Sequence, residues 1–183
     1  MTDNIEMTPV QEALKRSWGW LLGLGILFLI LGFVGLGMMV GVTLVSVLFL
    51  GVLLIIGGFS QFIDVFKSKD WPAAFWHAVI AVLYIIGGGV IIYDPFLAST
   101  VITAFIASIL IVIGVVRLIM AITLRHTKGW GWLLFAGLIA IFLGVLILAQ
   151  WPWSGLWVIG MFISIELLVN GWTYIFMALA IRR

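Results

Sequence analysis

Residues 18–39 read WGWLLGLGILFLILGFVGLGMM, a stretch without a charged side chain. A helix needs about 20 consecutive apolar residues to cross about 30 Å of hydrocarbon, so this stretch predicts a transmembrane helix. Runs of the same character recur along the chain. The six predicted spans are residues 18–39, 42–63, 74–93, 98–123, 130–149 and 155–180. The sequence therefore predicts an all-α, polytopic membrane protein with six transmembrane helices.

The composition excludes several classes of protein. Of the 183 residues, 65% are hydrophobic and 9% are charged, whereas soluble domains carry about 25% charged residues. The chain has no cysteine and two scattered histidines, which excludes thiolate chemistry and a histidine-rich metal site. A net charge of +2 is too small for a nucleic-acid footprint. We therefore expect one transmembrane domain over residues 18–183, with no metal, cofactor, catalytic residue or nucleic-acid partner.

Basic residues gather on one side of the predicted membrane, because every second connection between spans is nearly uncharged. The positive-inside rule assigns the basic side to the cytoplasm, so both termini are predicted to be cytoplasmic, with residues 1–17 as an N-terminal segment. The first span is longer than a signal-peptide core, and we expect it to remain in the protein. The nine basic residues are Lys15, Arg16, Lys67, Lys69, Arg117, Arg125, Lys128, Arg182 and Arg183.

The opposite side carries one formal charge, Asp94, in the turn Tyr93-Asp94-Pro95. Pro95 is predicted to begin the next helix, because the first helical position needs no amide donor. Tryptophan rings lie near the ends of the spans, as in the aromatic belts of membrane proteins. We interpret these rings as interfacial anchors.

An internal repeat is the second organising feature. Trp20, Trp76 and Trp132 are separated by 56 positions, and WGWLL at residues 18–22 recurs at residues 130–134. In the second, fourth and sixth spans the glycines align at a spacing of 57. These repeats predict three parallel helical hairpins packed about a pseudo-threefold axis along the membrane normal. The predicted hairpins are residues 18–63, 74–123 and 130–180.

Glycine is abundant, with 21 residues, and small residues let transmembrane helices approach closely. Two pairs have the i, i+4 spacing that favours close packing, and a further set is repeated among the even-numbered spans. The glycines predicted to pack are Gly19, Gly23, Gly37, Gly41, Gly57, Gly114 and Gly171. The run Gly87-Gly88-Gly89 allows two interpretations, close packing or a flexible point.

The repeated hairpins and the Trp-Gly-Trp-Leu-Leu starts of the first and fifth spans resemble the HdeD family of bacterial acid-resistance membrane proteins. The similarity covers nearly the whole chain, from about residue 18 to residue 180. It implies a bacterial inner-membrane protein linked to protection against acid stress, with no established enzymatic activity or cofactor. The family offers no active-site residues that could be assigned to positions in this chain.

Glu166 is the strongest candidate for a functional polar residue. It lies near the middle of the sixth span, where an ionisable group is costly and often functional. Hydrocarbon favours the neutral carboxylic acid, and Asn170 is one turn away as a hydrogen-bond partner. The two residues form a candidate proton-responsive site. The alternative is a structural, protonated Glu166 that is hydrogen-bonded across helices.

Four other ionisable positions are candidates for ion pairing or pH sensing. Arg117 and Asp64 are predicted to lie within about 6 Å along the helix axis, so an ion pair at the cytoplasmic edge is feasible. His77 and His126 titrate in the range of a pH sensor. We interpret His77 instead as an interfacial residue and His126 as part of a solvated basic loop.

Three classes of function follow from these observations. The first is a non-enzymatic acid-stress protein, and the second is a small channel or transporter that uses Glu166. The third, an intramembrane enzyme, is disfavoured because no acid-base pair, metal cluster or activated nucleophile is evident. The lipid bilayer is the expected partner, and a homo-oligomer or a membrane partner protein is left open.

Overall fold

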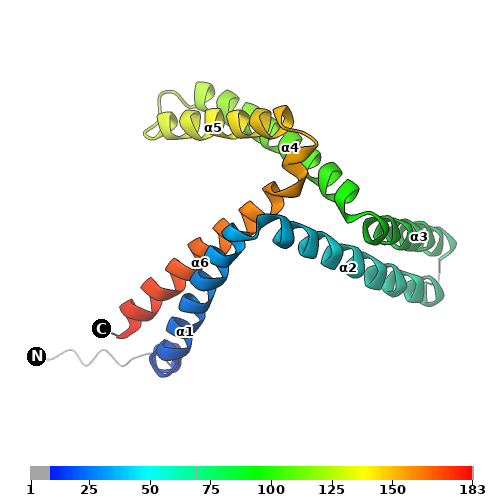
Figure 1. The fold of residues 1–183 in the computed structure, drawn as a ribbon, viewed down its shortest axis with the longest axis horizontal. Coiled ribbons are helices and arrows are strands. Elements are labelled where there is room, and N and C mark those ends of the chain that lie inside the picture. The colour runs from blue at the N-terminus through cyan, green and yellow to red at the C-terminus, as the bar shows by residue number, and fades with distance from the viewer. Residues whose placement is uncertain (1–8, 69, 183) are drawn as a thin grey trace, which may run out of the picture. The chain divides into compact units, whose positions relative to one another are not determined.

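Long helices make up most of the chain in the computed structural model, which describes residues 9–68 and 70–182 (Figure 1). One short 3-10 helix, η1, interrupts the series before the last α-helix. Their bounds are α1 Pro9–Gly37, α2 Met39–Lys67, α3 Trp71–Tyr93, α4 Pro95–Thr123, α5 Trp130–Ala149, η1 Trp153–Leu156 and α6 Val158–Arg182. All six α-helices are long and apolar enough to cross a membrane, which confirms the predicted fold class.

Local sequence explains where the helices begin. The backbone N–H of Leu97 donates to the Asp94 carboxylate at 2.9 Å, which caps α4, and Pro95 is its first residue as predicted. Pro72 lies in the first turn of α3. Gly129 precedes α5 with a φ of 95°, a left-handed conformation that favours glycine. The connections therefore follow from capping and turn chemistry.

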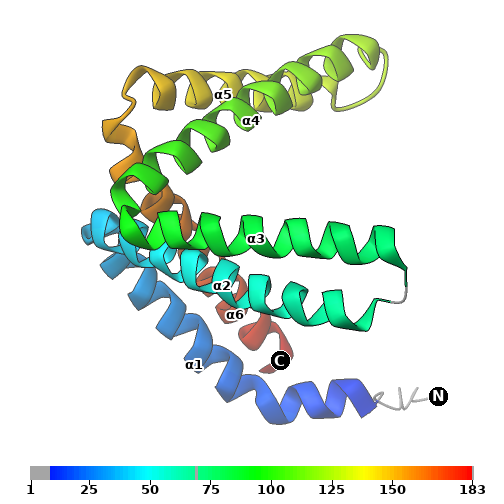
Figure 2. The same ribbon diagram turned by 90° about the vertical axis from the view of Figure 1, so that its right-hand side faces the viewer.

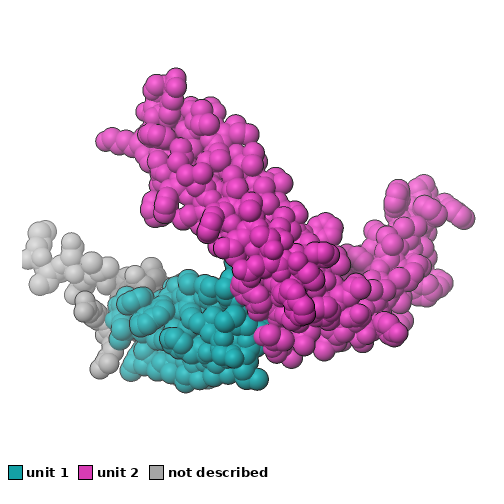
Figure 3. All heavy atoms as spheres, turned by 45° about the horizontal axis from the view of Figure 1, so that its top comes forward, with its two compact units in different colours: residues 1–39, 160–183 teal, residues 40–159 magenta. Residues whose placement is uncertain are grey.

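The chain divides into two compact units, which Figure 3 shows in separate colours. Unit 1 holds residues 1–39 and 160–183, and unit 2 holds residues 40–159. In the described part of unit 1, α1 and α6 run antiparallel and cross closely through small residues. A Cβ atom built on Gly171 would lie 2.9 Å from the carbonyl oxygen of Gly25, and one on Gly32 would lie 2.7 Å from Leu168 Cγ.

Unit 2 contains two antiparallel pairs, α2 with α3 and α4 with α5. A Cβ on Gly88 would lie 2.6 Å from the carbonyl oxygen of Gly51, and one on Gly114 would lie 2.8 Å from that of Gly137. In both ribbon views α3 and α4 diverge from their connecting turn, whereas α4 and α5 run side by side (Figures 1 and 2). The closest crossings in this unit are therefore α2 with α3 and α4 with α5.

Inside unit 2 the close helix pairs differ from the predicted hairpin of the third with the fourth span. The sequence predicted hairpins of the first with the second span, the third with the fourth, and the fifth with the sixth. Within unit 1 the close crossing joins α1 to α6, and within unit 2 the close crossings join α2 to α3 and α4 to α5.

Large apolar side chains remain exposed along the helices. Phe33 is 63% exposed, Phe105 is 67% exposed and Phe142 is 66% exposed. The buried positions are mostly small, such as Ala81, Ala107 and Ala121, each with no exposed surface. A soluble protein would bury its phenylalanines, whereas helices surrounded by lipid tails turn large apolar groups outward and pack through small residues. The distribution agrees with a multi-pass membrane protein.

Candidate functional site

The helix crossings share one local geometry that recurs in both units. Each even-numbered helix has a glycine at its crossing with an odd-numbered helix. This glycine faces a backbone carbonyl group of the odd-numbered helix and the residue four positions later on the same helix. Gly58 faces Ala81 and Ile85, Gly114 faces Gly137 and Ile141, and Gly171 faces Gly25 and Leu29. In each case the facing atoms are a carbonyl oxygen and the backbone nitrogen four residues later.

A second small position on each odd-numbered helix completes the crossing. Gly88 faces Gly51 and Ile55, while Gly144 faces Ala107 and Ile111. Gly32 faces Leu168, the residue four positions after the buried Ser164. Gly32, Gly88 and Gly144 are separated by 56 positions. Each crossing is therefore a copy of the same pair of small-residue contacts.

The structure corrects the repeat register at its first copy. The sequence aligned Gly57 with Gly114 and Gly171, but Gly58 occupies the equivalent place in the crossing. A Cβ on Gly58 would lie 2.6 Å from Ile85 Cγ1, whereas one on Gly57 would lie 3.3 Å from the Tyr84 ring. The spacing is 56 from α2 to α4, and it becomes 57 only from α4 to α6, where η1 precedes the last helix.

Other glycines singled out from the sequence lie away from these contacts. Among the described residues, no atom outside their own helical turn lies within 4 Å of a Cβ built on Gly19, Gly23 or Gly37. In the Gly87–Gly89 run, Gly88 packs and its two neighbours are open. A packing role for Gly19, Gly23, Gly37 and Gly41 stays a prediction. Most glycines at the crossings recur in the sequence with a period of 56. The i, i+4 spacing of glycines does not identify them.

Glu166 and Asn170 lie on α6 in unit 1, and both are exposed. The side of α6 that meets α1 carries Leu168 and Gly171, so the candidate proton-responsive residues point away from α1. Thr173, on the same stripe, donates its hydroxyl to the Val169 carbonyl at 2.8 Å. Within the described part of the chain, Glu166 and Asn170 make no side-chain hydrogen bond or ion pair, with each other or with other residues.

The ion pair considered for Asp64 and Arg117 is not formed between these residues in unit 2. Asp64 is half-buried on α2, and Arg117 is exposed on α4 with its Cβ facing Gly137 of α5. Their helices each pack closest against a different partner, α3 and α5 respectively. The repeat spacing predicted only how far apart Asp64 and Arg117 lie along the helix axis. It did not predict which helices pack against each other.

His77 has a partner that the sequence did not reveal. Its Nδ1 lies 2.7 Å from Oε1 of Gln61, so the half-buried imidazole of α3 is hydrogen-bonded to α2. An amide oxygen can only accept, and Nδ1–H of His77 is therefore the donor. His126 remains in the connection after α4, where Arg125 Nε lies 3.3 Å from its Nε2.

The described residues offer no arrangement of side chains suited to binding a metal ion. They hold no group of three or more histidine, aspartate or glutamate side chains close enough to share a metal ion. Two of the buried serine hydroxyls donate to nearby carbonyl groups. Ser154 donates to the Ile147 carbonyl at 2.9 Å, and Ser164 donates to that of Gly160 at 2.7 Å.

The comparison with known families finds the same period of 56 residues as the helix crossings. A family described as a short repeat of unknown function (DUF308) matches residues 23–93 and again residues 79–149. The two matches are displaced by 56 positions and together span more than two thirds of the chain. No curated protein and no solved structure matches the chain. The chain belongs to the DUF308 short-repeat family.

Proposed function

We propose that this chain is a non-enzymatic protein of a bacterial inner membrane that contributes to resistance against acid stress. The observation that carries the proposal is the repeated DUF308 match, because HdeD proteins belong to this family. The Trp-Gly-Trp-Leu-Leu starts of α1 and α5 add a resemblance to HdeD proteins in particular. Six apolar helices with glycine crossings support a role within the bilayer.

The proposed topology places both termini in the cytoplasm and Asp94 on the outer side. The basic connections support this orientation through the positive-inside rule. Asp94 would then be the only Asp, Glu, Lys, Arg or His on the outer side. Alkaline phosphatase and green fluorescent protein fused after residue 183 test the orientation. Phosphatase activity of that fusion would contradict it.

Glu166 is the proposed proton-responsive residue. It is exposed on α6 on the side away from α1, and nothing among the described residues neutralises its carboxyl group. An ionisable group inside a transmembrane helix is costly and is often functional. Asn170, one helical turn away, is the donor available on the same stripe. Proton uptake by Glu166 would remove a charge from the membrane interior.

Survival at low external pH tests the proposal. A strain lacking the chain would receive the wild type, Glu166→Gln or Glu166→Asp at matched expression. We expect rescue by the wild type and by Glu166→Asp, which keeps the carboxyl group, but reduced survival with Glu166→Gln. Equal rescue by all three would remove Glu166 from the mechanism. Failure of the wild type to rescue would contradict the acid-stress function itself.

A small channel or transporter is the second candidate function. The same polar stripe supports it, because Glu166, Asn170 and Thr173 form a line of polar groups on one side of an apolar helix. Proton flux into liposomes containing the purified chain would distinguish the two functions. We expect flux that depends on Glu166 if the chain conducts protons. Flux equal to that of protein-free liposomes would favour a role in packing or partner binding.

A further inference from the structure

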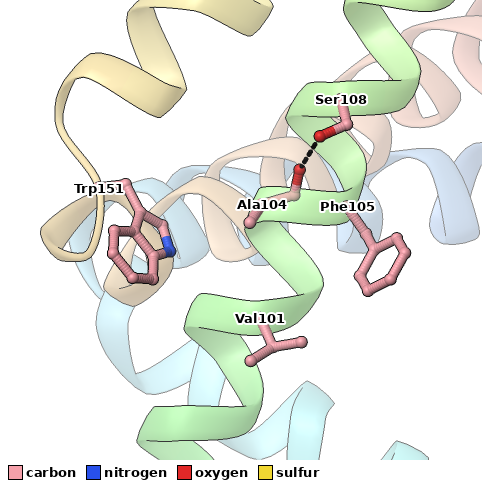
Figure 4. A pocket seen from close by; sticks show the side chains of 5 residues that line it. All are labelled: Val101, Ala104, Phe105, Ser108 and Trp151. Atoms are coloured by element: carbon pink, nitrogen blue, oxygen red, sulfur yellow. Dashed lines mark hydrogen bonds between the residues drawn. The ribbon is translucent and has the colours of Figure 1, made fainter.

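A groove of about 270 Å³ lies on α4 in unit 2, beside the connection that follows α5 (Figure 4). Its lining residues are Val101, Ala104, Phe105, Ser108 and Trp151. Trp151 stands at one side of α4, and its indole Nε1–H donates to the carbonyl of Thr100 at 3.2 Å. This hydrogen bond holds the ring against the helix and makes it one wall of the groove.

The groove presents no free polar group. The Ser108 hydroxyl donates to the carbonyl of Ala104 at 2.8 Å, a bond drawn in Figure 4. The Trp151 N–H is occupied by Thr100, and the other lining side chains are hydrocarbon. A polar solute would lose its hydrogen bonds to water on entering and gain none. The lining therefore selects a hydrocarbon occupant.

The repeat shows how the groove arises. Two of its α4 positions are the same in every copy, with valine at 45, 101 and 158 and phenylalanine at 49, 105 and 162. The other two differ, because Ala104 and Ser108 stand where α2 has Leu48 and Val52. The last copy has a methionine at 161 and an isoleucine at 165. The side chains at 104 and 108 of α4 are thus smaller than those at the equivalent positions of the other two copies.

The groove also lies at the depth of lipid tails. Val101 is six residues and Ser108 thirteen residues beyond Pro95, the first residue of α4. At 1.5 Å per residue these positions lie about 9 and 20 Å along the helix from its start. Half of a bilayer's hydrocarbon is about 15 Å thick. The groove therefore begins within one leaflet and reaches about the middle of the membrane.

We propose that this groove binds one acyl chain of a membrane phospholipid. The chain lies along α4 from Val101 to Ser108, with the Trp151 ring against its side. Ala104 and Ser108 provide the space, and Phe105 bounds it. The occupant is a bound lipid that exchanges more slowly than the lipid around the equivalent stretch of α2. This site is independent of Glu166 and of the proposed acid-stress function.

Photolabelling tests the proposal in the full chain. The protein would be reconstituted with phosphatidylcholine that carries a diazirine in one acyl chain, irradiated, digested and mapped by mass spectrometry. We expect residues 101–108 and Trp151 to be labelled severalfold more than residues 45–52. That α2 segment is the internal control, because it is the repeat copy with Leu48 and Val52 at the positions of Ala104 and Ser108, and its side chains Val45, Phe49 and Val52 are exposed.

Variants that copy α2 into α4 fill the groove. Ala104→Leu with Ser108→Val should lower the labelling of residues 101–108 to the level of residues 45–52. Val116→Leu, which enlarges an exposed side chain of α4 outside the groove, should leave the labelling unchanged. Equal labelling of both segments in the wild type would mean annular lipid only and would overturn the proposal. Undiminished labelling in the filled, folded variant would also overturn it, and the wild-type comparison decides the matter if that variant fails to fold.

Discussion

The α2–α3 and α4–α5 pairs of unit 2 are two copies of one crossing with different surroundings. In both pairs, small residues contact the backbone of the partner helix at two equivalent positions. At one of these positions, Gly88 contacts Gly51 in the α2–α3 pair, and Gly144 contacts Ala107 in the α4–α5 pair. Beyond the crossing, α2 and α3 share the His77–Gln61 hydrogen bond. At the positions 56 residues later, α4 and α5 have Arg117 and Leu133 instead.

The difference separates what the repeat preserves from what each copy has changed. Backbone approach needs small side chains at fixed positions, so those positions recur in every copy. Side chains outside the crossing do not affect that approach, and they carry features specific to one pair. The His77–Gln61 hydrogen bond lies between α2 and α3, and the groove at residues 101–108 lies on α4 beside Trp151. Features specific to one helix pair of this chain are therefore expected outside the crossings.

The largest effect is expected from adding a methyl group at the crossing. Gly88→Ala would place Cβ 2.6 Å from the Gly51 carbonyl oxygen, and backbone must move to admit it. Overpacking of this kind costs about 1–3 kcal/mol, and Gly144→Ala should cost a similar amount because its Cβ would lie 2.8 Å from the Ala107 carbonyl oxygen. Denaturant unfolding in lipid bicelles measures both losses.

Gly87→Ala is the matched control for this experiment. No atom beyond its own helical turn lies within 4 Å of that Cβ position among the described residues, so the change should stay within about 0.5 kcal/mol of the wild type. If Gly88→Ala lowers the free energy of unfolding and Gly144→Ala does not, the two helix pairs are not equivalent. Equal losses for Gly87→Ala and Gly88→Ala would show that helix geometry, and not the crossing, requires glycine.

An intermediate effect should distinguish two adjacent glycines of α2. Gly58→Ala should lower the free energy of unfolding by about 1–2 kcal/mol, because its Cβ would meet Ile85 Cγ1 at 2.6 Å. Gly57→Ala meets only the Tyr84 ring, at 3.3 Å, and should cost less. The same unfolding measurement compares them. A larger loss of unfolding free energy for Gly57→Ala than for Gly58→Ala would contradict the crossing geometry. It would support the sequence alignment that pairs Gly57 with Gly114 at a spacing of 57.

The smallest effect concerns the hydrogen bond found in one pair only. A double-mutant cycle of His77→Leu and Gln61→Leu should give a coupling free energy of about 0.6 kcal/mol, the average for such bonds between membrane helices. The equivalent cycle, Arg117→Ala with Leu133→Ala, should give none. Zero coupling between positions 61 and 77 would show that the bond does not hold α3 to α2.

Much of the fold could be predicted from local sequence. Long apolar runs located all six helices, and the Asp94-Pro95 pair located the start of α4. The period of 56 also emerged, since it is a property of the sequence itself. The candidate sites were less predictable. Glu166 was evident as a charge within a span, but the partner of His77 and the groove beside Trp151 depend on contacts between distant segments.

The sequence by itself determined that the chain forms six apolar helices in repeated order, because hydropathy is summed over some 20 neighbouring residues. The tertiary structure alone decided which helices pair, which of the 21 glycines meet a backbone, and that Asp64 and Arg117 remain apart in unit 2. The physical reason is that these helices are apolar all round. In water a hydrophobic stripe marks the packing face of a helix, whereas in lipid every face is apolar and only close steric fit selects the partner.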